Sequence, residues 1–182
     1  MPGFPGAEVR SQLSATGKMV RETLEAILTA VLLALFIRTF VVESFLVLGN
    51  SMEPNLHNRE RLFINKIVYR LREPGQGEII VFRYPKDPGR DFVKRVIACG
   101  GDTLEIRDGT VYVNGERLAE TYQPDRDYAD FPAVEVGEGM IFVLGDNRDN
   151  SEDSRFFGAV PRGYIKGRAL FVYWPLQRWR FL

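Results

Sequence analysis

The apolar segment at residues 19–42 constrains the fold more than any other feature of this 182-residue chain. Its centre, residues 26–37, contains no charged side chain. The centre alone is shorter than the about 20 apolar residues that span a bilayer, but the whole segment would form a helix of about 36 Å. Its charged residues lie near the two ends, where long side chains can reach the interface: Arg21, Glu22, Glu25 and Arg38. The segment therefore predicts a single transmembrane anchor helix at residues 19–42.

Two other interpretations of this segment are weaker. A buried core helix would be apolar on all faces over residues 26–37, and a chain of this length has little interior to enclose it. A cleaved secretion signal needs a small-x-small site just past the apolar run. No alanine occurs between Ala34 and Ala98, and the nearest such triplet, residues 49–51, lies far downstream. An uncleaved anchor remains the prediction.

The residues before the anchor predict its orientation. Arg10, Lys18 and Arg21 favour an N-terminus in the cytoplasm, because positive charge is retained on that side of a membrane. Residues 1–18 carry scattered Gly and Pro and show no apolar period, so we expect a flexible cytoplasmic tail. Residues 43–182 are then expected to be extracytoplasmic and held at the cell membrane by one helix.

Residues 43–182 predict antiparallel β structure. Short runs rich in branched and aromatic side chains are bounded by turn residues, and Asp108-Gly109 and Asn114-Gly115 form two-residue hairpin turns. No long helical period follows the anchor. We expect a mainly β fold, with an antiparallel β-sheet domain behind one N-terminal transmembrane helix. The expected strands cover residues 43–48, 62–68, 78–82, 91–97, 104–107, 110–113, 116–118, 140–144 and 169–174.

Composition excludes several classes of function. Lys+Arg and Asp+Glu both number 24 and the pI is near 6.6, which argues against a nucleic-acid-binding protein that relies on phosphate contacts. The chain has one cysteine, Cys99, and one histidine, His57, so neither an intrachain disulfide nor a Cys/His zinc site can form. A histidine-dependent catalytic triad could use only His57.

A first candidate site is the Gly- and Pro-flanked turn at residues 49–54, which contains Ser51. Such a turn can expose a serine Oγ together with its own backbone N–H, although an ordinary turn has the same composition. The G-x-S-x-G elbow of lipases is not present, because Glu53 occupies the position of the second glycine. His57 is too close in the chain to return readily to Ser51 as a base.

A second candidate is Lys94, within the predicted strand 91–97. Alternation along a strand places Lys94 on one face with Phe92 and Val96, and Arg95 on the other. An apolar surrounding disfavours the charged form of a lysine, which lowers its pKa and allows it to act as a general base. The alternative is an ordinary lysine at a sheet edge, paired with an acid.

A third candidate is the polar loop at residues 145–155, which follows the predicted strand 140–144. An EF-hand calcium loop counted from Asp149 fails, because Ser154 stands at its sixth position and Val160 at its twelfth. A solvated loop is possible, but mixed Asp, Arg and Ser side chains after a buried strand favour a mutually hydrogen-bonded scaffold.

Four ordered motifs together resemble the bacterial type I signal peptidases, which are Ser-Lys membrane proteases. Residues 51–56 resemble the nucleophile motif of that family, with Asn55 where Thr is usual, and residues 76–82 resemble its second motif. Residues 92–102 resemble the lysine motif, and residues 145–158 match the last motif almost residue for residue. The resemblance covers roughly residues 19–175.

The resemblance implies a role for each matching residue. Ser51 would be the nucleophile, Lys94 the general base, and Ser151 the hydroxyl that orients the lysine. Asp153 and Arg155 would form an ion pair that braces the site. The resemblance adds two further supporting residues, Asp146 and Arg148. No metal or organic cofactor is implied.

The resemblance also implies how the site meets its substrate. The Ser51 N–H would donate to the oxyanion, whereas Gly49 stands where some family members supply a second donor from a serine. Secretory preproteins would be cut after small residues (Ala-X-Ala type), their cleavage segment adding as a strand between residues 43–48 and 91–94. The enzyme is expected to act as a monomer at the bilayer. The residues implied to line its substrate pockets are Phe45, Val47, Met52, Leu56, Phe92 and Val93.

Two other functions remain open: a membrane-anchored β binding module without activity, and a Ser-Lys protease for a different class of precursor.

The C-terminal stretch suggests a further contact. Residues 171–174 are expected to close the β core, and no strand is expected beyond Pro175. Trp179 and Phe181, which alternate with Arg178 and Arg180, predict contact with the bilayer interface.

Overall fold

The structure is a computed structural model that describes residues 6–120 and 129–182, with side chains described from residue 18 onward in the N-terminal part. The chain divides into two compact units, Met1–Val41 and Val42–Leu182. We describe each unit by itself.

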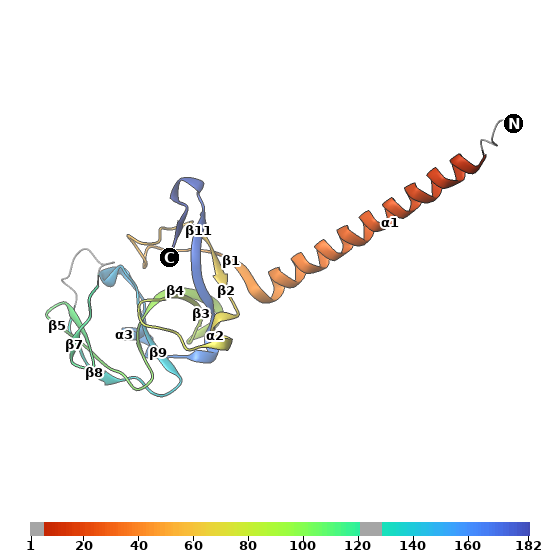
Figure 1. Cartoon of the computed structure of the whole chain (residues 1–182). Helices are drawn as coiled ribbons and strands as arrows, with labels where there is room; N and C mark the ends of the chain where they lie inside the picture. The colour runs from red at the N-terminus through yellow and green to blue at the C-terminus, as the bar shows by residue number, and fades with distance from the viewer. Residues whose placement is uncertain (1–5, 121–128) are drawn as a thin grey trace. The chain divides into compact units, whose positions relative to one another are not determined.

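The first unit is one long helix (Figure 1). Helix α1 covers Gly6–Phe36, and a π-helical turn, η1, continues it over Ile37–Val41. Within the described residues, Lys18–Val41 is the one helical stretch whose length and composition suit a membrane span. The helix begins upstream of the predicted anchor, so the described residues 6–18 are helical and not a loose tail. No proline interrupts residues 6–18, and Ala, Glu, Arg, Gln and Leu favour helix there; residues 1–5 lie outside the described part.

The second unit is built on a large antiparallel sheet, which confirms the predicted mainly β fold. Its order is β1-β2-β11-β3-β4-β9-β10, and β12 pairs with β11. The strands are β1 (Val42–Leu46), β2 (Arg61–Asn65), β3 (Ile79–Tyr84), β4 (Asp87–Cys99), β9 (Met140–Leu144), β10 (Val160–Pro161), β11 (Ile165–Trp174) and β12 (Arg180–Phe181). Short helices α2 (Val68–Leu71) and α3 (Ser154–Phe157) and the 3-10 turns η2 (Arg148–Asn150), η3 (Arg162–Tyr164) and η4 (Leu176–Arg178) connect them.

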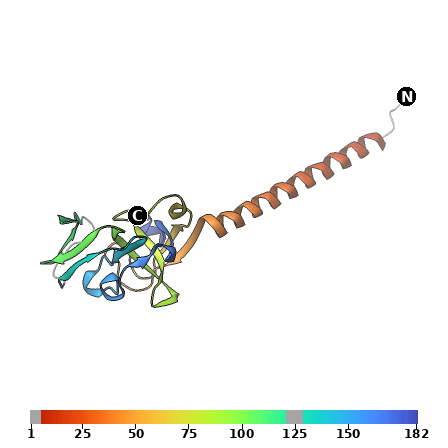
Figure 2. The same cartoon turned by 90° about the horizontal axis from the view of Figure 1, so that it is seen from below.

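A second, four-stranded sheet lies at the opposite end of this unit from β1 and β2 (Figures 1 and 2). Its strands are β5 (Thr103–Arg107), β6 (Thr110–Val113), β7 (Glu116–Arg117) and β8 (Phe131–Glu135), in the order β7-β6-β5-β8. Both predicted hairpin turns are present. Asp108 and Gly109 have φ of 47° and 64°, and Asn114 and Gly115 have φ of 54° and 79°, as two-residue turns of this kind require.

Three strands were not predicted: β8, β10 and β12. Strand β8 contains Pro132 and lacks a clean alternation, and the other two are only two residues long. The expectation that no strand follows Pro175 is wrong, because Arg180 and Phe181 pair with Val172 and Phe171 of β11. Isolated two-residue pairs leave no periodicity in a sequence and depend on the neighbouring strand.

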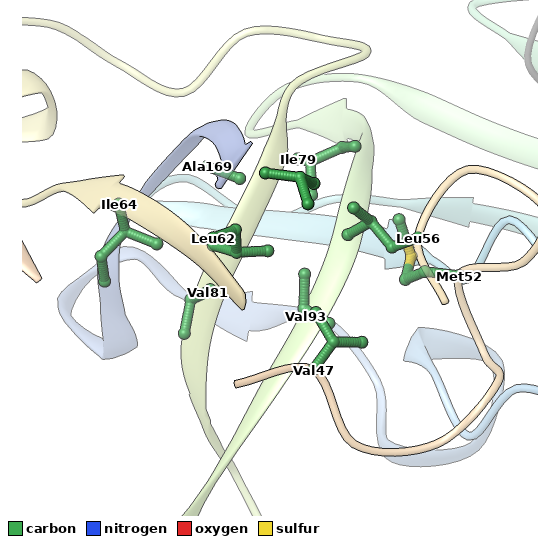
Figure 3. Close-up of a cluster of buried hydrophobic side chains, with 10 residues drawn as sticks. Val47, Met52, Leu56, Leu62, Ile64, Ile79, Val81, Val93 and Ala169 are labelled. Carbon is green, nitrogen blue, oxygen red and sulfur yellow. The ribbon is translucent and has the colours of Figure 1, made fainter. Parts of the chain in front are cut away.

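The large sheet encloses an apolar cluster formed by β2, β3, β4, β11 and the segment that follows β1 (Figure 3). Leu62, Ile79 and Val93 belong to it, and the side chains of Val47, Met52 and Leu56 point into the same space. The segment of residues 47–56 is therefore anchored by its apolar side chains, while its polar residues lie at the rim.

Besides β10 and β12, which each pair with one strand, two edges of the large sheet lack a further partner strand within the described residues. Strand β1 ends the sheet, since it pairs with β2 alone. Strand β4 pairs with β3 along Asp87–Arg95 but pairs with β9 only from Arg95 onward. The other side of residues 91–94 is therefore open for hydrogen bonding.

Candidate active site

A cleft of about 570 Å³ lies between these two open edges. Residues 45–46 and 48–51 line one side, and residues 90–94 line the other. Asn150 and Glu152, from the polar loop after β9, complete its wall. The three candidate sites from the sequence therefore meet around one cleft.

Ser51 and Lys94 are in direct contact in this cleft. Lys94 Nζ donates a hydrogen bond of 2.6 Å to Ser51 Oγ and another of 3.1 Å to the carbonyl oxygen of Val93. Lys94 is only 4% exposed, and its Nζ lies 5.1 Å from the centre of the Phe92 ring. The contact thus joins the two residues that the sequence predicts as nucleophile and base.

Burial decides the protonation of Lys94. Desolvation lowers its pKa from 10.5 to about 8, although the negative charges of Asp153, Glu152 and Asp146 oppose this shift. A substantial fraction of the amine is therefore neutral in mildly alkaline solution. A neutral amine at 2.6 Å from a serine hydroxyl can accept its proton.

The polar loop 145–155 holds the backbone around Ser51. Asn147 N donates to Ser51 O at 3.0 Å, and Asn147 Nδ2 donates to Asn50 O at 3.2 Å. Asn55 Nδ2 donates to Asp146 Oδ2 at 2.9 Å. These bonds tie residues 50–55 to the loop that follows β9.

The polar loop is itself held by ion pairs. Arg155 Nε and Nη2 donate to the two oxygens of Asp153 at 2.8 and 2.9 Å, which is the predicted pair, and Gly145 N donates to Asp153 Oδ2 at 3.1 Å. The predicted supports pair elsewhere. Asp146 accepts two bonds, of 2.8 and 2.6 Å, from Arg95, and Arg148 pairs with Glu120. The ion pairs Asp146–Arg95 and Arg148–Glu120 join the loop to distant segments of the chain.

Ser151 differs from its expected role. Its Oγ is buried and has no hydrogen-bond partner among the described residues, so the implied bond to Lys94 is absent from this structure. Ser151 nevertheless lies against Gly145: a Cβ atom added to Gly145 would lie 2.6 Å from Ser151 Cβ and would also clash with Ser51 O. Only glycine therefore allows Ser51 and Ser151 to approach each other at this point.

The predicted pocket residues divide into two groups. Phe45, Phe92 and Val93 line the cleft. Val47, Met52 and Leu56 do not: they are at most 1% exposed and belong to the apolar cluster of Figure 3. Their burial anchors the turn segment that carries Ser51 in the apolar cluster. Leu46 and Leu48, which were not predicted, line the cleft in their place.

Comparison with known proteins identifies the family. The profile of the family described as signal peptidase, peptidase S26, matches residues 20–174. The chain belongs to this family. The family resemblance seen in the motifs is thereby confirmed.

Relatives of this signal peptidase family cover most of the chain. It is 39% identical over 176 residues to the probable signal peptidase I-1 of Synechocystis sp., an alignment that covers 93% of this chain and 90% of the relative. The probable signal peptidase I-2 of the same organism is 44% identical, covering 85% of this chain and 73% of that protein. The signal peptidase I of Bacillus licheniformis is 39% identical, covering 87% and 91%. A solved signal peptidase I from Enterococcus faecalis has 36% identity and a TM-score of 0.49, covering 53% of this chain and 97% of that chain.

The sequence did not reveal several residues that hold the site. Glu120, the partner of Arg148, lies far from the loop in the chain and stands in no recognisable motif. Arg95 was expected only to face away from Lys94, and its bond to Asp146 could not be predicted. For Gly145 and Asn55 a signal was present, because both lie within the quoted motifs, but the motifs alone did not show what they contact.

Proposed function

We propose that this chain is a membrane-bound serine endopeptidase that removes N-terminal signal peptides from secretory preproteins. Ser51 is the proposed nucleophile and Lys94 the proposed general base. The observation that carries the proposal is the 2.6 Å contact between Lys94 Nζ and Ser51 Oγ at the side of an open cleft. The printed names of the relatives, signal peptidase I, support the choice of substrate.

The proposed reaction has two halves. Neutral Lys94 Nζ takes the proton of Ser51 Oγ as this oxygen attacks the scissile carbonyl carbon. The resulting ammonium returns the proton to the leaving amine, and the new N-terminus departs. Water, deprotonated by the same amine, then attacks the acyl ester, and Ser51 regains its proton. The Ser51 N–H would stabilise the oxyanion, and Gly49 offers no hydroxyl to assist it.

The two open edges support the proposed binding mode. An extended peptide between residues 43–48 and 91–94 would pair with backbone on both sides. Phe45, Leu48 and Phe92 bring bulky side chains to the cleft, so we expect small residues such as alanine next to the cut bond. Ala-X-Ala cleavage follows as part of the proposal.

The membrane-related predictions also belong to this proposal. An anchor at residues 19–42 with a cytoplasmic N-terminus would leave the β unit on the extracytoplasmic side. Ser51 follows residue 42 by nine positions, which keeps it within about 30 Å of the end of the anchor. Trp179 and Phe181, 54% and 73% exposed, are suited to the bilayer interface. A functional monomer is part of the same proposal.

The test is cleavage of a purified secretory precursor, with the new N-terminus determined by sequencing. Ser51→Ala and Lys94→Ala should each lower the rate by several orders of magnitude. His57→Ala and Cys99→Ala serve as controls and should keep most of the activity. A large loss with His57→Ala would favour a histidine mechanism, and wild-type turnover of Lys94→Ala would refute the assignment of the base.

A panel of precursors tests the substrate class. Signal-peptide precursors with Ala at the cleavage site should be cut, and variants with a bulky residue there should not. Preferential cleavage of membrane precursors that lack such a site would support the other Ser-Lys protease class instead.

A further inference from the structure

The C-terminal strand β12 reaches the proposed nucleophile segment through Arg180. Its Nη1 donates to Glu60 Oε1 at 3.1 Å, and its Nη2 donates to Glu60 Oε2 at 2.9 Å. Nη2 also donates to the backbone carbonyl of Asn55. One guanidinium therefore joins two points of the segment that follows Ser51, from a position 120 residues further along the chain than Glu60.

Glu60 makes this contact strong. Its side chain is buried, with the residue 1% exposed, and it also accepts a bond of 3.1 Å from His57 N. Burial raises the pKa of this carboxyl, but the bonds from Arg180 and from the His57 N–H outweigh that effect and hold the pKa below its ordinary value. Arg178 approaches Glu60 only at 3.5 Å. The buried carboxylate thus depends mainly on Arg180.

Asn55 connects the same contact to the polar loop. Its side-chain amide donates to Asp146, while its carbonyl accepts from Arg180. Leu56 N donates to Met52 O at 2.8 Å, which links this point to the residue next to Ser51. A short run of bonds therefore connects the Arg180 guanidinium to the backbone that carries the Ser51 hydroxyl.

We propose that Arg180 is a positioning residue that keeps Ser51 Oγ at the distance and angle needed for proton transfer to Lys94. The inference rests on the proposed function, since it takes Ser51 as the nucleophile. The planar guanidinium is suited to this role because it reaches a carboxylate and a carbonyl at once, whereas a lysine ammonium has no such fork. A small misplacement of a reacting atom is enough to slow catalysis strongly.

Arg180→Lys in the full-length protein in detergent is the first test. It keeps the positive charge beside Glu60 and loses the second arm. We expect kcat on a precursor peptide to fall about tenfold or more, with KM within twofold of wild type. Amide hydrogen exchange should become faster in residues 50–60 and stay unchanged in β4. Arg178→Lys, at the neighbouring and weaker contact, is the matched control and should leave kcat, KM and exchange unchanged.

A double variant separates positioning from folding. Glu60→Gln with Arg180→Met removes both charges, so no buried carboxylate is left unpaired. We expect it to fold and to show the same loss of kcat as Arg180→Lys. If either variant folds with kcat within twofold of wild type, or if both variants unfold, Arg180 has no positioning role.

Ser51→Ala, measured in the same series, separates a failure of the proposed function from a failure of the Arg180 inference. An inactive Ser51→Ala together with a fully active Arg180→Lys would overturn this inference and leave the proposed function standing. Normal cleavage by Ser51→Ala would overturn the proposed function. If Ser51→Ala cleaves normally, unchanged amide hydrogen exchange at residues 50–60 in Arg180→Lys would also show that the Arg180 contact does not hold this segment.

Discussion

The two sheets of the β unit differ in how their strands are connected and in which side chains they bury. Strands β5, β6 and β7 follow one another through two-residue turns, and their buried side chains, such as Leu104, Ile106 and Val111, are apolar. The large sheet brings together segments far apart in the chain and has buried charged groups beside the cleft. Among the described residues, the two buried charged side chains that lie in strands, Lys94 and Arg95, both belong to β4 of the large sheet, and the other buried charges lie in connecting segments. The small sheet is stabilised by packing between strands that are close in the chain. In the large sheet, the burial of polar groups costs some stability.

The buried charges of the large sheet are not equivalent. Arg95, Arg148 and Asp153 each have an ion-pair partner at short distance. Lys94 has none within the described residues, and its Nζ is bonded only to a hydroxyl and a carbonyl. A paired lysine would keep its proton. The pairs therefore hold the loop, whereas the lowered pKa of Lys94 allows this residue to lose its proton in mildly alkaline solution.

Replacement of Lys94 should have the largest effect and the most unusual combination of results. Lys94→Met should abolish cleavage and yet raise the stability of the fold at pH 7, because a protonated lysine is costly at a site that lowers its pKa from 10.5 to about 8. A shift of this size corresponds to roughly 3 kcal/mol as an upper limit. Thermal and denaturant unfolding, compared with wild type, measure it.

The size of this stability effect depends on pH. Below pH 8 the lysine is protonated in both the folded and the unfolded chain, so its full cost is present. Between about pH 8 and 10.5 the folded chain loses its proton first, and the cost declines. The stability advantage of Lys94→Met should therefore shrink as pH rises through this window. A constant advantage would mean that Lys94 is not desolvated.

The pH dependence of cleavage should show the next largest effect. The rate should fall about tenfold per pH unit below an apparent pKa of about 8, since protonated Lys94 cannot accept the Ser51 proton. Glu152, whose charge raises the pKa of Lys94, lines the cleft. Glu152→Gln should move the acidic limb to lower pH. A limb that stays in place, or that lies near the ordinary lysine value in wild type, would contradict this account.

One type of substitution, made in both sheets, sharpens the comparison. Gly145→Ala should lower kcat/KM about a hundredfold, because the added methyl group would displace Ser151 and the Ser51 carbonyl. Gly115→Ala, in a turn of the small sheet with φ of 79° and no neighbouring atom within 4 Å, should cost about 1 kcal/mol of stability and leave kcat/KM unchanged. If Gly145→Ala and Gly115→Ala changed kcat/KM equally, the proposed difference between the two sheets would be wrong.

The smallest expected effect is at Arg59. Its φ is 69°, a conformation for which the turns of the small sheet use glycine at Gly109 and Gly115. Arg59 is exposed, and its backbone N–H donates to Val47 O at 2.9 Å, a bond that glycine can also form. Arg59→Gly should stabilise the fold by up to about 1 kcal/mol. A lower unfolding midpoint would show that the arginine side chain compensates for its backbone conformation.

The small sheet was also the more predictable one. Its Asp-Gly and Asn-Gly turns carry their conformation in two adjacent residues, so β5, β6 and β7 could be located from the sequence. The strands of the large sheet were located within a few residues, but their order depends on contacts between distant segments. The bonds Asn55–Asp146, Arg148–Glu120 and Arg180–Glu60 join residues with no common pattern. The burial of Val47, Met52 and Leu56 shows the same limit, because their place in the apolar cluster depends on contacts with β2, β3 and β4 that are distant in the sequence.

The two open edges beside the cleft have a consequence for solubility. An exposed strand edge is a template on which another chain can add, and such edges are a common origin of aggregation. Here residues 43–48 and 91–94 border the same cleft, so a strand that enters it can satisfy both edges at once. Once it is inside, the edges of residues 43–48 and 91–94 would no longer be available to a second chain. At this cleft, the arrangement would therefore limit edge pairing to one added strand.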